Sequence, residues 1–340
     1  MKNNIFLAYG TRPEIIKLSP VIQELENRNI SYKTIFTGQH RELYEDVKDL
    51  VPPPDFSLNI MKENQSLTDI VSCISSEFSK LLISETPNLL IVQGDTSTVA
   101  VCSLIAFYQQ VPVGHVEAGL RTYDLSSPYP EEGNRQIVSR IASYNWAPTK
   151  LAVNQLNEEK VQNIILTGNT IVDACTKFDY SVSYNNQILI TLHRRENFGG
   201  KIKKIVQDIE TLSIRHPELE FIFPMHPNPN IQSLKKLLKH VNVIDPLNYT
   251  EMMKLLSNVK FVISDSGGIQ EECACFKKKI LVCRNTTERP EGLDAGLAKL
   301  VDIHVIDHFA WANDSPEWSG NNPYGEGDAA IKIVDSISNE

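Results

Sequence analysis

Short apolar runs alternate with amphipathic stretches along the whole chain, and this alternation constrains the fold more than any other feature. The runs IFLAY at 5–9, LLIV at 89–92 and FVIS at 261–264 carry almost no polar residues. Strands of a parallel sheet read in this way because helices cover both of its faces. The stretches between the runs favour helices, for example NIQSLKKLLKH at 230–240. The pattern therefore predicts an α/β fold built from βαβ units.

The alternation occurs in two series, which predicts two Rossmann-like domains facing a central cleft. The joint between the series lies near 168–185 and contains the polar stretch SVSYNN. We expect an N-terminal domain over 1–168 and a C-terminal domain over 169–322, with a final helix at about 323–340 that packs back on the first domain. A chain of 340 residues is long enough for two such domains. Ligands of such sheets bind beyond the carboxyl ends of the strands.

Composition and charge narrow the classes of function. Hydrophobic residues make up 41% of the chain, and the formal net charge is -9. The chain therefore has enough apolar residues to form hydrophobic cores. Its negative charge differs from the basic surface of a typical nucleic-acid-binding protein. The first apolar run is too short for a signal peptide, and no run of about 18 apolar residues predicts a membrane span. The cysteines lack the spacing of a disulfide framework, so we expect a reduced, cytoplasmic protein. From the charge and the short apolar runs we expect no nucleic-acid or membrane partner.

Charged residues in the first half gather where strands end and helices begin. Arg12 and Lys17 follow the first strand, Asp95 follows LLIV, Glu117 ends the strand VPVGHVE, and Glu131 opens a helix. Each position also has a structural explanation, because acids cap helices and are stabilised by the helix dipole. The first loop, GTRPE, contains one glycine, so it matches neither the dinucleotide fingerprint nor a P-loop. Together these positions place three acids in one half of the protein.

The second half carries histidines and arginines at equivalent strand ends. His193 and Arg194 end its first strand, and His226 ends its second. Two histidines in equivalent positions favour a functional role over a structural one. The competing hypothesis is a metal site, but no C-x-x-C spacing occurs among the cysteines. We therefore expect no metal.

The stretch SDSGGIQEE at 264–272 predicts an anion site. Ser266 and the two glycines after it place N–H groups at a helix N-terminus, which suits a phosphate or diphosphate. Arg289 is a candidate cation for the same anion. Glu272 lies about one turn into the helix, where a carboxylate can accept hydrogen bonds from ribose hydroxyls. The alternative is an ordinary glycine-rich turn followed by acids.

The motifs of the chain resemble those of bacterial and archaeal UDP-N-acetylglucosamine 2-epimerases, and they occur in the same order. They are GTRPEIIKLSP, GDTST, GHVEAGLRT, PEEGNR, TGNTIVDA, HRREN, SDSGGIQEE and RNTTERPEG. The resemblance extends from residue 10 to NPYGEG at 322–327. It implies a glycosyltransferase-B-like fold with a nucleotide sugar between two Rossmann-like domains, and it implies no cofactor.

The reaction implied by this resemblance is a non-hydrolysing epimerisation. The proton on the carbon that bears the N-acetyl group is removed, and UDP leaves the anomeric carbon. The acetamidoglucal intermediate takes up a proton on the opposite face and UDP adds back, which gives UDP-N-acetylmannosamine. Such chemistry requires acid/base groups on both faces of the ring and stabilisation of the leaving diphosphate.

The resemblance also implies roles for single residues. The positions that match catalytic residues of the family are Asp95, Glu117, Glu131 and His193. The residues expected to bind the substrate or its UDP group are Arg12, Lys17, Arg121, Arg135, Arg194, His226, Ser266, Gly267, Gly268, Glu272 and Arg289. Which carboxylate removes the proton and which returns it stays open. The histidine can instead stabilise the departing diphosphate.

Many bacterial members of the family bind a second substrate molecule as an allosteric activator. The residues that resemble part of that site are Gln39, His40, Arg41 and Gln65. Asn64 stands where some regulated members have an arginine. The chain therefore matches the allosteric pattern only in part.

Two alternatives share the fold and the UDP site. A hydrolysing epimerase would release UDP and free N-acetylmannosamine, because water attacks the intermediate in place of UDP. A UDP-sugar glycosyltransferase would need an acceptor site, and three acids in one half favour proton transfer instead. The resemblance further implies a homodimer and a role in supplying N-acetylmannosamine for a surface polysaccharide.

Overall fold

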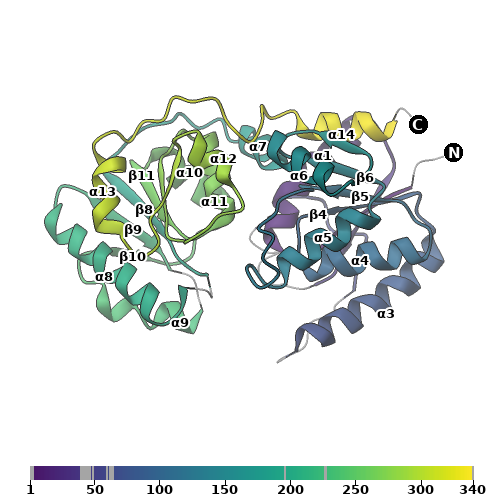
Figure 1. Ribbon diagram of the computed structural model, residues 1–340, viewed down its shortest axis with the longest axis horizontal. Helices are drawn as coiled ribbons and strands as arrows, with labels where there is room; N and C mark the ends of the chain where they lie inside the picture. The colour runs from purple at the N-terminus through teal and green to yellow at the C-terminus, as the bar shows by residue number, and fades with distance from the viewer. Residues whose placement is uncertain are drawn as a thin grey trace. The chain divides into compact units, whose positions relative to one another are not determined.

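The computed structural model divides into two compact units (Figure 1). Unit 1 comprises Met1–Ala174 and Tyr324–Glu340, and unit 2 comprises Cys175–Pro323. The domain boundaries expected at residues 168 and 322 stay a prediction. The residues that the structure describes are 4–38, 47, 50–58, 60, 65–194, 197–225 and 228–338.

Unit 1 is built on a parallel seven-stranded sheet in the order β3-β2-β1-β4-β5-β6-β7. Its strands are β1 (Ile5–Tyr9), β2 (Tyr32–Phe36), β3 (Phe56–Ser57), β4 (Leu89–Gln93), β5 (Val113–Val116), β6 (Tyr144–Ala147) and β7 (Ile164–Leu166). Its helices are α1 (Arg12–Asn27), α3 (Leu67–Glu85), α4 (Ser97–Tyr108), α5 (Glu131–Ile141), α6 (Lys150–Glu158), α7 (Thr170–Thr176), which runs into unit 2, and α14 (Ala329–Ser338).

Unit 2 is built on a parallel six-stranded sheet in the order β10-β9-β8-β11-β12-β13. Its strands are β8 (Gln187–Thr191), β9 (Glu220–Pro224), β10 (Asn242–Ile244), β11 (Phe261–Ser264), β12 (Ile280–Val282) and β13 (Ala298–Leu300). Its α-helices are α8 (Gly200–Arg215), α9 (Pro229–Gln232), α10 (Tyr249–Asn258), α11 (Gly267–Cys275), α12 (Pro290–Asp294) and α13 (Val305–Asn313).

One expected helix is shorter than the sequence indicated. The segment 230–240 forms α9 and a 3₁₀ turn at Lys235–Leu237 in place of a continuous helix. Ile231, Leu234 and Leu238 are nevertheless buried in the core of unit 2. Apolar residues three or four positions apart can share one face of successive tight turns, so the periodicity predicted the buried face correctly and the continuous helix wrongly.

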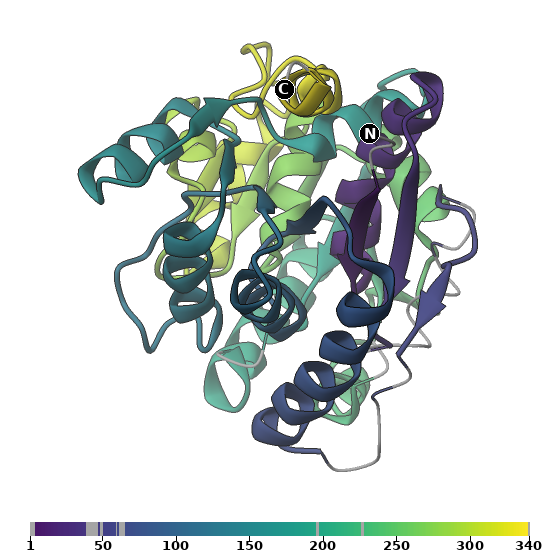
Figure 2. The same ribbon diagram turned by 90° about the vertical axis from the view of Figure 1, so that its right-hand side faces the viewer.

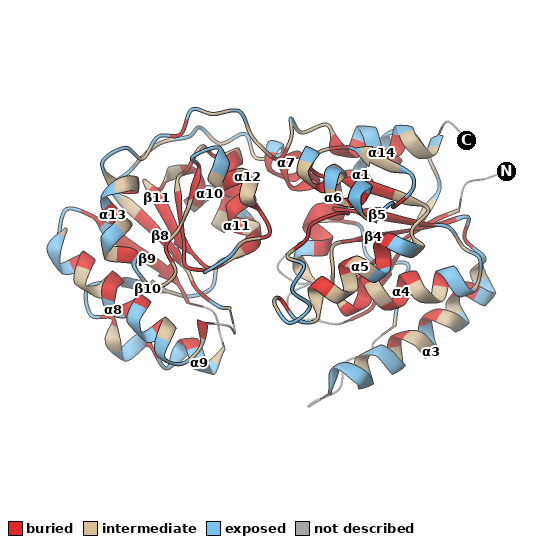
Figure 3. Ribbon diagram, in the orientation of Figure 1, coloured by how far each residue is buried: buried red, intermediate tan, exposed pale blue. Residues whose placement is uncertain are grey.

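The apolar runs form the interiors of both sheets, as Figure 3 shows by their burial. Every residue of β1, β4 and β11 is buried. Helices pack on these strands through clusters that include Phe78 in unit 1 and Phe309 in unit 2. The predicted α/β class with two Rossmann-like domains is confirmed. Among the described residues, no helix combines the length and the apolar character that crossing a membrane requires.

The C-terminal helix α14 belongs to unit 1 and contacts α1 (Figure 2). The indole nitrogen of Trp146 donates a hydrogen bond to Ser336 Oγ at 2.9 Å. The backbone N–H of Ala330 donates to Asp173 Oδ1 at 2.9 Å. These contacts fasten the last segment of the chain to the unit that also contains the first segment.

The strand order of each sheet reverses direction at one point, and this reversal positions the candidate site. It lies between β1 and β4 in unit 1, and between β8 and β11 in unit 2. The loops that leave the carboxyl ends of the two neighbouring strands diverge there, which is where open α/β sheets bind their ligands.

Candidate functional site

Glu117 is the most enclosed of the predicted catalytic residues of unit 1. It directly follows β5, and its carboxylate forms a buried ion pair with Lys17 of α1. Gln93 and Asn169 donate side-chain hydrogen bonds to the same oxygen at 3.2 and 3.4 Å. The backbone of Glu117 has a φ of +67°, in the left-handed region that costs a non-glycine residue roughly 1–2 kcal/mol. Such strain is typical of functional sites, where surrounding contacts enforce it.

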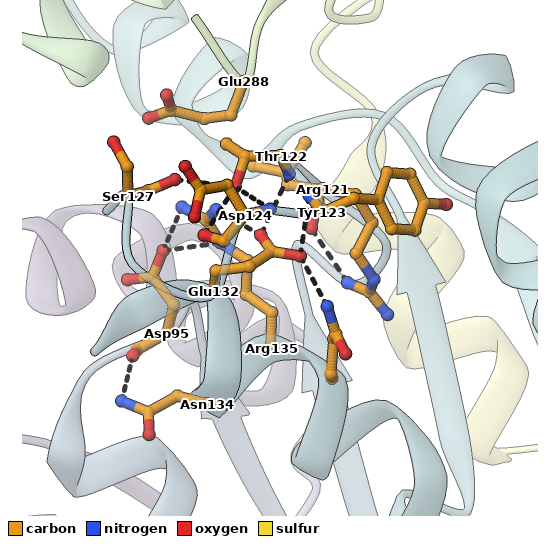
Figure 4. A network of polar contacts seen from close by, with 12 residues as sticks. Asp95, Arg121, Thr122, Tyr123, Asp124, Ser127, Glu132, Asn134, Arg135 and Glu288 are labelled. Atoms are coloured by element: carbon orange, nitrogen blue, oxygen red, sulfur yellow. Dashed lines mark hydrogen bonds and ion pairs between the residues drawn. The ribbon is translucent and has the colours of Figure 1, made fainter. Parts of the chain in front are cut away.

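Asp95 follows β4, and Arg12 follows β1, the strand on the other side of the strand-order reversal. Residues of α5 hold Asp95 in place (Figure 4). Arg135 donates to Asp95 Oδ2 from Nε at 2.9 Å and from Nη2 at 2.6 Å. The side chain of Asn134 donates to the backbone carbonyl of Asp95 at 2.7 Å. The guanidinium therefore orients the carboxylate and compensates its charge, while a quarter of the Asp95 side chain stays exposed.

Glu131 and Glu132 are neighbours in sequence, but the start of α5 separates their environments. The carboxylate of Glu132 is fully buried, and it accepts hydrogen bonds from the backbone N–H groups of Thr122 and Tyr123 at 3.0 and 3.2 Å. Arg135 donates to it as well, at 3.2 Å. Glu131, the first residue of the helix, is only half-buried. Glu132 thus holds the loop that contains Thr122 and Tyr123, whereas Glu131 lies at the amino-terminal end of α5.

The guanidinium group of Arg121 is engaged within unit 1. It binds Glu159 through Nε and Nη2 at 2.8 and 3.0 Å, and its Nη2 also donates to Ser139 Oγ at 2.9 Å. Its Nη1 donates to the carbonyl of Leu120. These contacts give Arg121 a structural task, and its predicted contact with the substrate stays a prediction. Arg12 is the half-buried first residue of α1 at the carboxyl end of β1.

Glu14 is a buried carboxylate that sequence reasoning did not single out. Its Oε2 accepts hydrogen bonds from the backbone N–H groups of Gly10 and Thr11 at 2.6 and 2.7 Å, and its Oε1 accepts one from the hydroxyl of Thr96. Burial raises the pKa of Glu14 to about 7, although these hydrogen bonds favour the ionised form. Glu14 therefore joins the loop that carries Arg12 to the loop that carries Asp95.

His115 lies inside the sheet of unit 1. It has no exposed surface, and its Nε2 lies 2.8 Å from the carbonyl oxygen of Gly94. Burial lowers the pKa of His115 to about 4, so the ring is neutral at pH 7. A neutral ring that donates from Nε2 braces the turn in front of Asp95 and has no exposed atom to offer a ligand.

In unit 2, two arginines converge on the amino-terminal end of α11. Gly267 is the first residue of this helix. A Cβ atom added there would lie 2.7 Å from Nη1 of Arg289 and 3.2 Å from Nη2 of Arg194. Glycine thus leaves room for two guanidinium groups beside the first turn of the helix. Helix N–H groups and guanidinium groups together bind phosphate-like anions, and the anion site at this helix stays a prediction.

Two buried carboxylates hold these arginines. Arg289 donates from Nε to Glu271 Oε1 at 2.6 Å and from Nη1 to Glu288. Glu288 also accepts from Arg284 Nη1 at 2.9 Å and lies 3.8 Å from Arg194 Nη2. Arg194, Arg284 and Arg289 are thus grouped around Glu288 near the start of α11. Sequence reasoning missed Glu288, although its place in RNTTERPEG between arginines was a usable signal.

His193 follows β8 at the strand-order reversal of unit 2. Its side chain is 41% exposed, and its Nδ1 lies 3.5 Å from Oδ1 of the buried Asp265. Glu272 is buried in α11, and Ser266 stands immediately before that helix. The predicted contact of Glu272 with a ribose stays a prediction.

Several predicted positions lie outside the described residues. They are His226 and the allosteric candidates Gln39, His40 and Arg41. The fourth allosteric candidate, Gln65, donates a side-chain hydrogen bond to the carbonyl of Ile60 at 2.9 Å. Within the described ranges, no group of three or more histidine, cysteine, aspartate or glutamate side chains is placed to hold a metal ion.

Comparisons with known proteins identify the family. Residues 23–338 match the family model described as UDP-N-acetylglucosamine 2-epimerase. The UDP-N-acetylglucosamine 2-epimerase of Campylobacter jejuni is 39% identical over 374 residues, which cover 99% of this chain and 98% of that protein.

Solved structures agree with this match. The UDP-GlcNAc 2-epimerase of Neisseria meningitidis, bound to UDP-GlcNAc, has a TM-score of 0.90 at 39% identity, over 99% of this chain and 100% of that one. The enzyme of Methanocaldococcus jannaschii, in complex with UDP-GlcNAc and UDP, has a TM-score of 0.87 at 34% identity, over 100% of both chains. The chain described here therefore belongs to the UDP-N-acetylglucosamine 2-epimerase family.

Proposed function

We propose that this chain catalyses the reversible conversion of UDP-N-acetylglucosamine to UDP-N-acetylmannosamine. The observation that carries the proposal is the convergence of Arg194 and Arg289 on Gly267 at the start of α11. A diphosphate is the part of the substrate whose charge suits this site. The related structures bind UDP-GlcNAc in Neisseria meningitidis, and UDP-GlcNAc and UDP in Methanocaldococcus jannaschii.

The proposed reaction is an elimination followed by an addition. A base removes the proton from the carbon that bears the N-acetyl group, and the bond between the anomeric carbon and the UDP oxygen breaks. Its electron pair leaves with UDP, whose charge Arg194, Arg289 and the first N–H groups of α11, at Gly267 and Gly268, stabilise. A proton then returns to the opposite face of the same carbon, and the UDP oxygen re-forms its bond to the anomeric carbon.

Four residues supply the acid/base chemistry in this proposal. Asp95, Glu117 and Glu131 provide the base for one face of the sugar and the acid for the other, because proton exchange on two faces needs two groups. His193 assists the departing diphosphate. Arg135 keeps Asp95 oriented as a carboxylate, which its two hydrogen bonds support.

Other predicted residues bind the nucleotide or support the catalytic groups in this proposal. We assign Glu272 and Ser266 to the UDP group next to the anion site, together with His226. Lys17 compensates the charge of Glu117, which their ion pair supports. Arg12 is the cation in unit 1 that we assign to the substrate itself.

Neither alternative function is favoured by a specific observation. A hydrolysing enzyme would let water reach the intermediate, and a transferase would bind an acceptor. The solved relatives are 2-epimerases by their printed names. We therefore take UDP, which the anion site retains, as the group that attacks the intermediate.

We further propose that the protein works as a cytoplasmic homodimer that supplies N-acetylmannosamine units for a surface polysaccharide. The motifs that the chain shares with its family support this assignment. All six cysteines are free thiols, which fits a reducing compartment.

The test is a reaction of the pure protein with UDP-N-acetylglucosamine in deuterated water, followed by proton NMR. We expect deuterium on the N-acetyl-bearing carbon of a UDP-linked manno product. Deuterated free N-acetylmannosamine with stoichiometric UDP would replace our proposal by the hydrolysing reaction. Absence of exchange and of product would refute both forms of epimerase. Asp95→Asn should lower kcat by about 10²–10⁴-fold while UDP still binds.

A further inference from the structure

Asp265 occupies the junction of the two loops that flank the strand-order reversal of unit 2. It lies between β11 and α11, and it has no exposed surface. Its Oδ1 accepts a hydrogen bond from the backbone N–H of His193 at 3.0 Å, and its Oδ2 accepts one from the N–H of Arg194 at 3.1 Å. The side-chain amide of Asn197 donates to Oδ2 at 3.0 Å. One carboxylate thus holds the loop after β8 against the start of the anion-binding helix.

The same carboxylate also faces the imidazole of His193. Nδ1 lies 3.5 Å from Oδ1, the oxygen that already accepts the backbone N–H of this residue. Catalytic hydrogen bonds are often long before the ligand binds, and they shorten in the complex. A carboxylate beside Nδ1 favours the tautomer that carries its proton on Nδ1. The ring is 41% exposed, so a ligand can reach it.

Holding the loop does not by itself explain a buried charge at Asp265. Burying an ionised carboxylate completely is costly unless hydrogen bonds and an opposite charge compensate it. Among the described partners of Asp265, the backbone N–H groups and the amide of Asn197 are neutral. The guanidinium of Arg194 lies toward Glu288. The imidazole of His193 is the partner that can become a cation.

We propose that Asp265 is the positioning residue of His193. It fixes the Nδ1–H tautomer and stabilises the imidazolium, whose Nε2–H then donates a hydrogen bond to the diphosphate as UDP departs. The kinetic part of this inference rests on the proposed epimerase function. Asp265 also begins the turn into α11. It therefore places the His193 imidazole and the first N–H groups of the helix near the same diphosphate.

The direct test measures the tautomer of His193 in the ligand-free protein. The full chain is labelled with ¹⁵N-histidine, and the His193→Gln variant identifies the His193 signals in two-dimensional ¹H–¹⁵N NMR. We expect wild-type His193 to carry its proton on Nδ1 when the ring is neutral, and the signal to move toward the Nε2–H form in Asp265→Asn. A wild-type ring protonated on Nε2 would overturn the proposal, whatever the activity.

The kinetic test compares three variants in the epimerase assay. Asp265→Asn keeps the shape of the side chain and removes its charge, and we expect kcat to fall about 10²-fold with KM little changed. Asn197→Ala removes a donor to the same carboxylate without touching the imidazole, so its kcat should fall far less. Asp208→Asn is the matched control, because Asp208 is a buried acid of α8 that pairs with Lys204. Its kcat should equal that of the wild type.

Each other result has a defined meaning. If Asn197→Ala loses as much kcat as Asp265→Asn, the carboxylate acts by fastening the loop, and the proposal is wrong. It is also wrong if Asp265→Asn keeps wild-type kcat. If Asp265→Asn does not fold, as a melting curve would reveal, the wild-type tautomer alone decides. A wild-type protein without epimerase activity refutes the proposed function and leaves the tautomer measurement to decide on Asp265.

Discussion

Lys17 and Glu117 form a buried ion pair in unit 1, although they are 100 residues apart in the chain. The pair connects α1, which follows β1, to the end of β5. In the sheet β4 lies between β1 and β5, and the strand order reverses between β1 and β4. In so buried a place, the opposite charges of the two side chains stabilise each other.

Removing one partner of this pair should cost more stability than removing both charges. Lys17→Met leaves Glu117 as a buried carboxylate without its cation, and we expect the free energy of unfolding to fall by about 3–5 kcal/mol. The double variant Lys17→Met/Glu117→Gln should recover part of that loss. Urea unfolding followed by circular dichroism measures both. Equal stability of Lys17→Met and the wild type would show that the pair contributes nothing.

Glu14 should make the stability of unit 1 depend on pH near neutrality. Its folded pKa is raised from an ordinary value of 4.5 to about 7, because the carboxyl is buried. A raised folded pKa contributes stability that is fully present below the unfolded pKa and is lost as the pH rises through about 7. The loss amounts to about 3 kcal/mol at most.

The variant Glu14→Gln should lack this pH dependence. Its amide oxygen can still accept the N–H groups of Gly10 and Thr11, while its nitrogen can donate to Thr96. We therefore expect the melting temperature of the wild type, relative to that of the variant, to fall between pH 5 and pH 8. Parallel curves for the two proteins would mean that Glu14 keeps an ordinary pKa.

The two glycines at the start of α11 should respond differently to a methyl group. A Cβ at Gly267 meets the guanidinium of Arg289 at 2.7 Å, whereas nothing lies within 4 Å of a Cβ at Gly268. Gly267→Ala should displace the arginine and weaken UDP binding roughly tenfold, about 1.4 kcal/mol. Gly268→Ala is the matched control and should bind nearly as the wild type does. Isothermal titration with UDP gives both affinities, and equal affinities would speak against an anion at this place.

The adjacent acids of α5 should separate stability from turnover. Glu132→Gln disturbs a fully buried carboxylate that accepts two backbone N–H groups and pairs with Arg135, so its main effect should be a lower melting temperature. Glu131→Gln changes a half-buried acid at the helix start, so its main effect should be a fall in kcat of about 10²-fold or more. Melting curves and initial rates on both variants check this, and the reverse pattern would exchange the two assignments.

The thiols should differ in their reaction with iodoacetamide. Burial raises the pKa of Cys273 and Cys283 above the ordinary thiol range, and the thiolate is the reactive form. Cys73 and Cys275 are half-buried. We therefore expect these two to be alkylated first in the native protein, as peptide mass mapping would show. Early modification of Cys273 or Cys283 would mean that unit 2 opens readily.

The sequence by itself determined the class of fold and most of the candidate positions. Runs such as IFLAY and FVIS are apolar throughout, and only strands covered on both faces satisfy that pattern. Residues that follow such strands, including Asp95 and His193, must lie at the carboxyl edge of their sheet, because all the strands are parallel. Local order along the chain was sufficient for these conclusions. It was insufficient for the segment 230–240, where tertiary packing replaced a continuous helix by short turns.

Only the tertiary structure decided which polar residues meet. The pairing of Lys17 with Glu117 and of Asp265 with His193 depends on the strand order, which brings distant loops together at the reversals. Charge and residue type do not reveal such partners, since a carboxylate at a helix start can cap the helix, hold an arginine or stay available. For Glu132 burial decided the role, because the free energy of burying a charge depends on partners contributed by the rest of the fold.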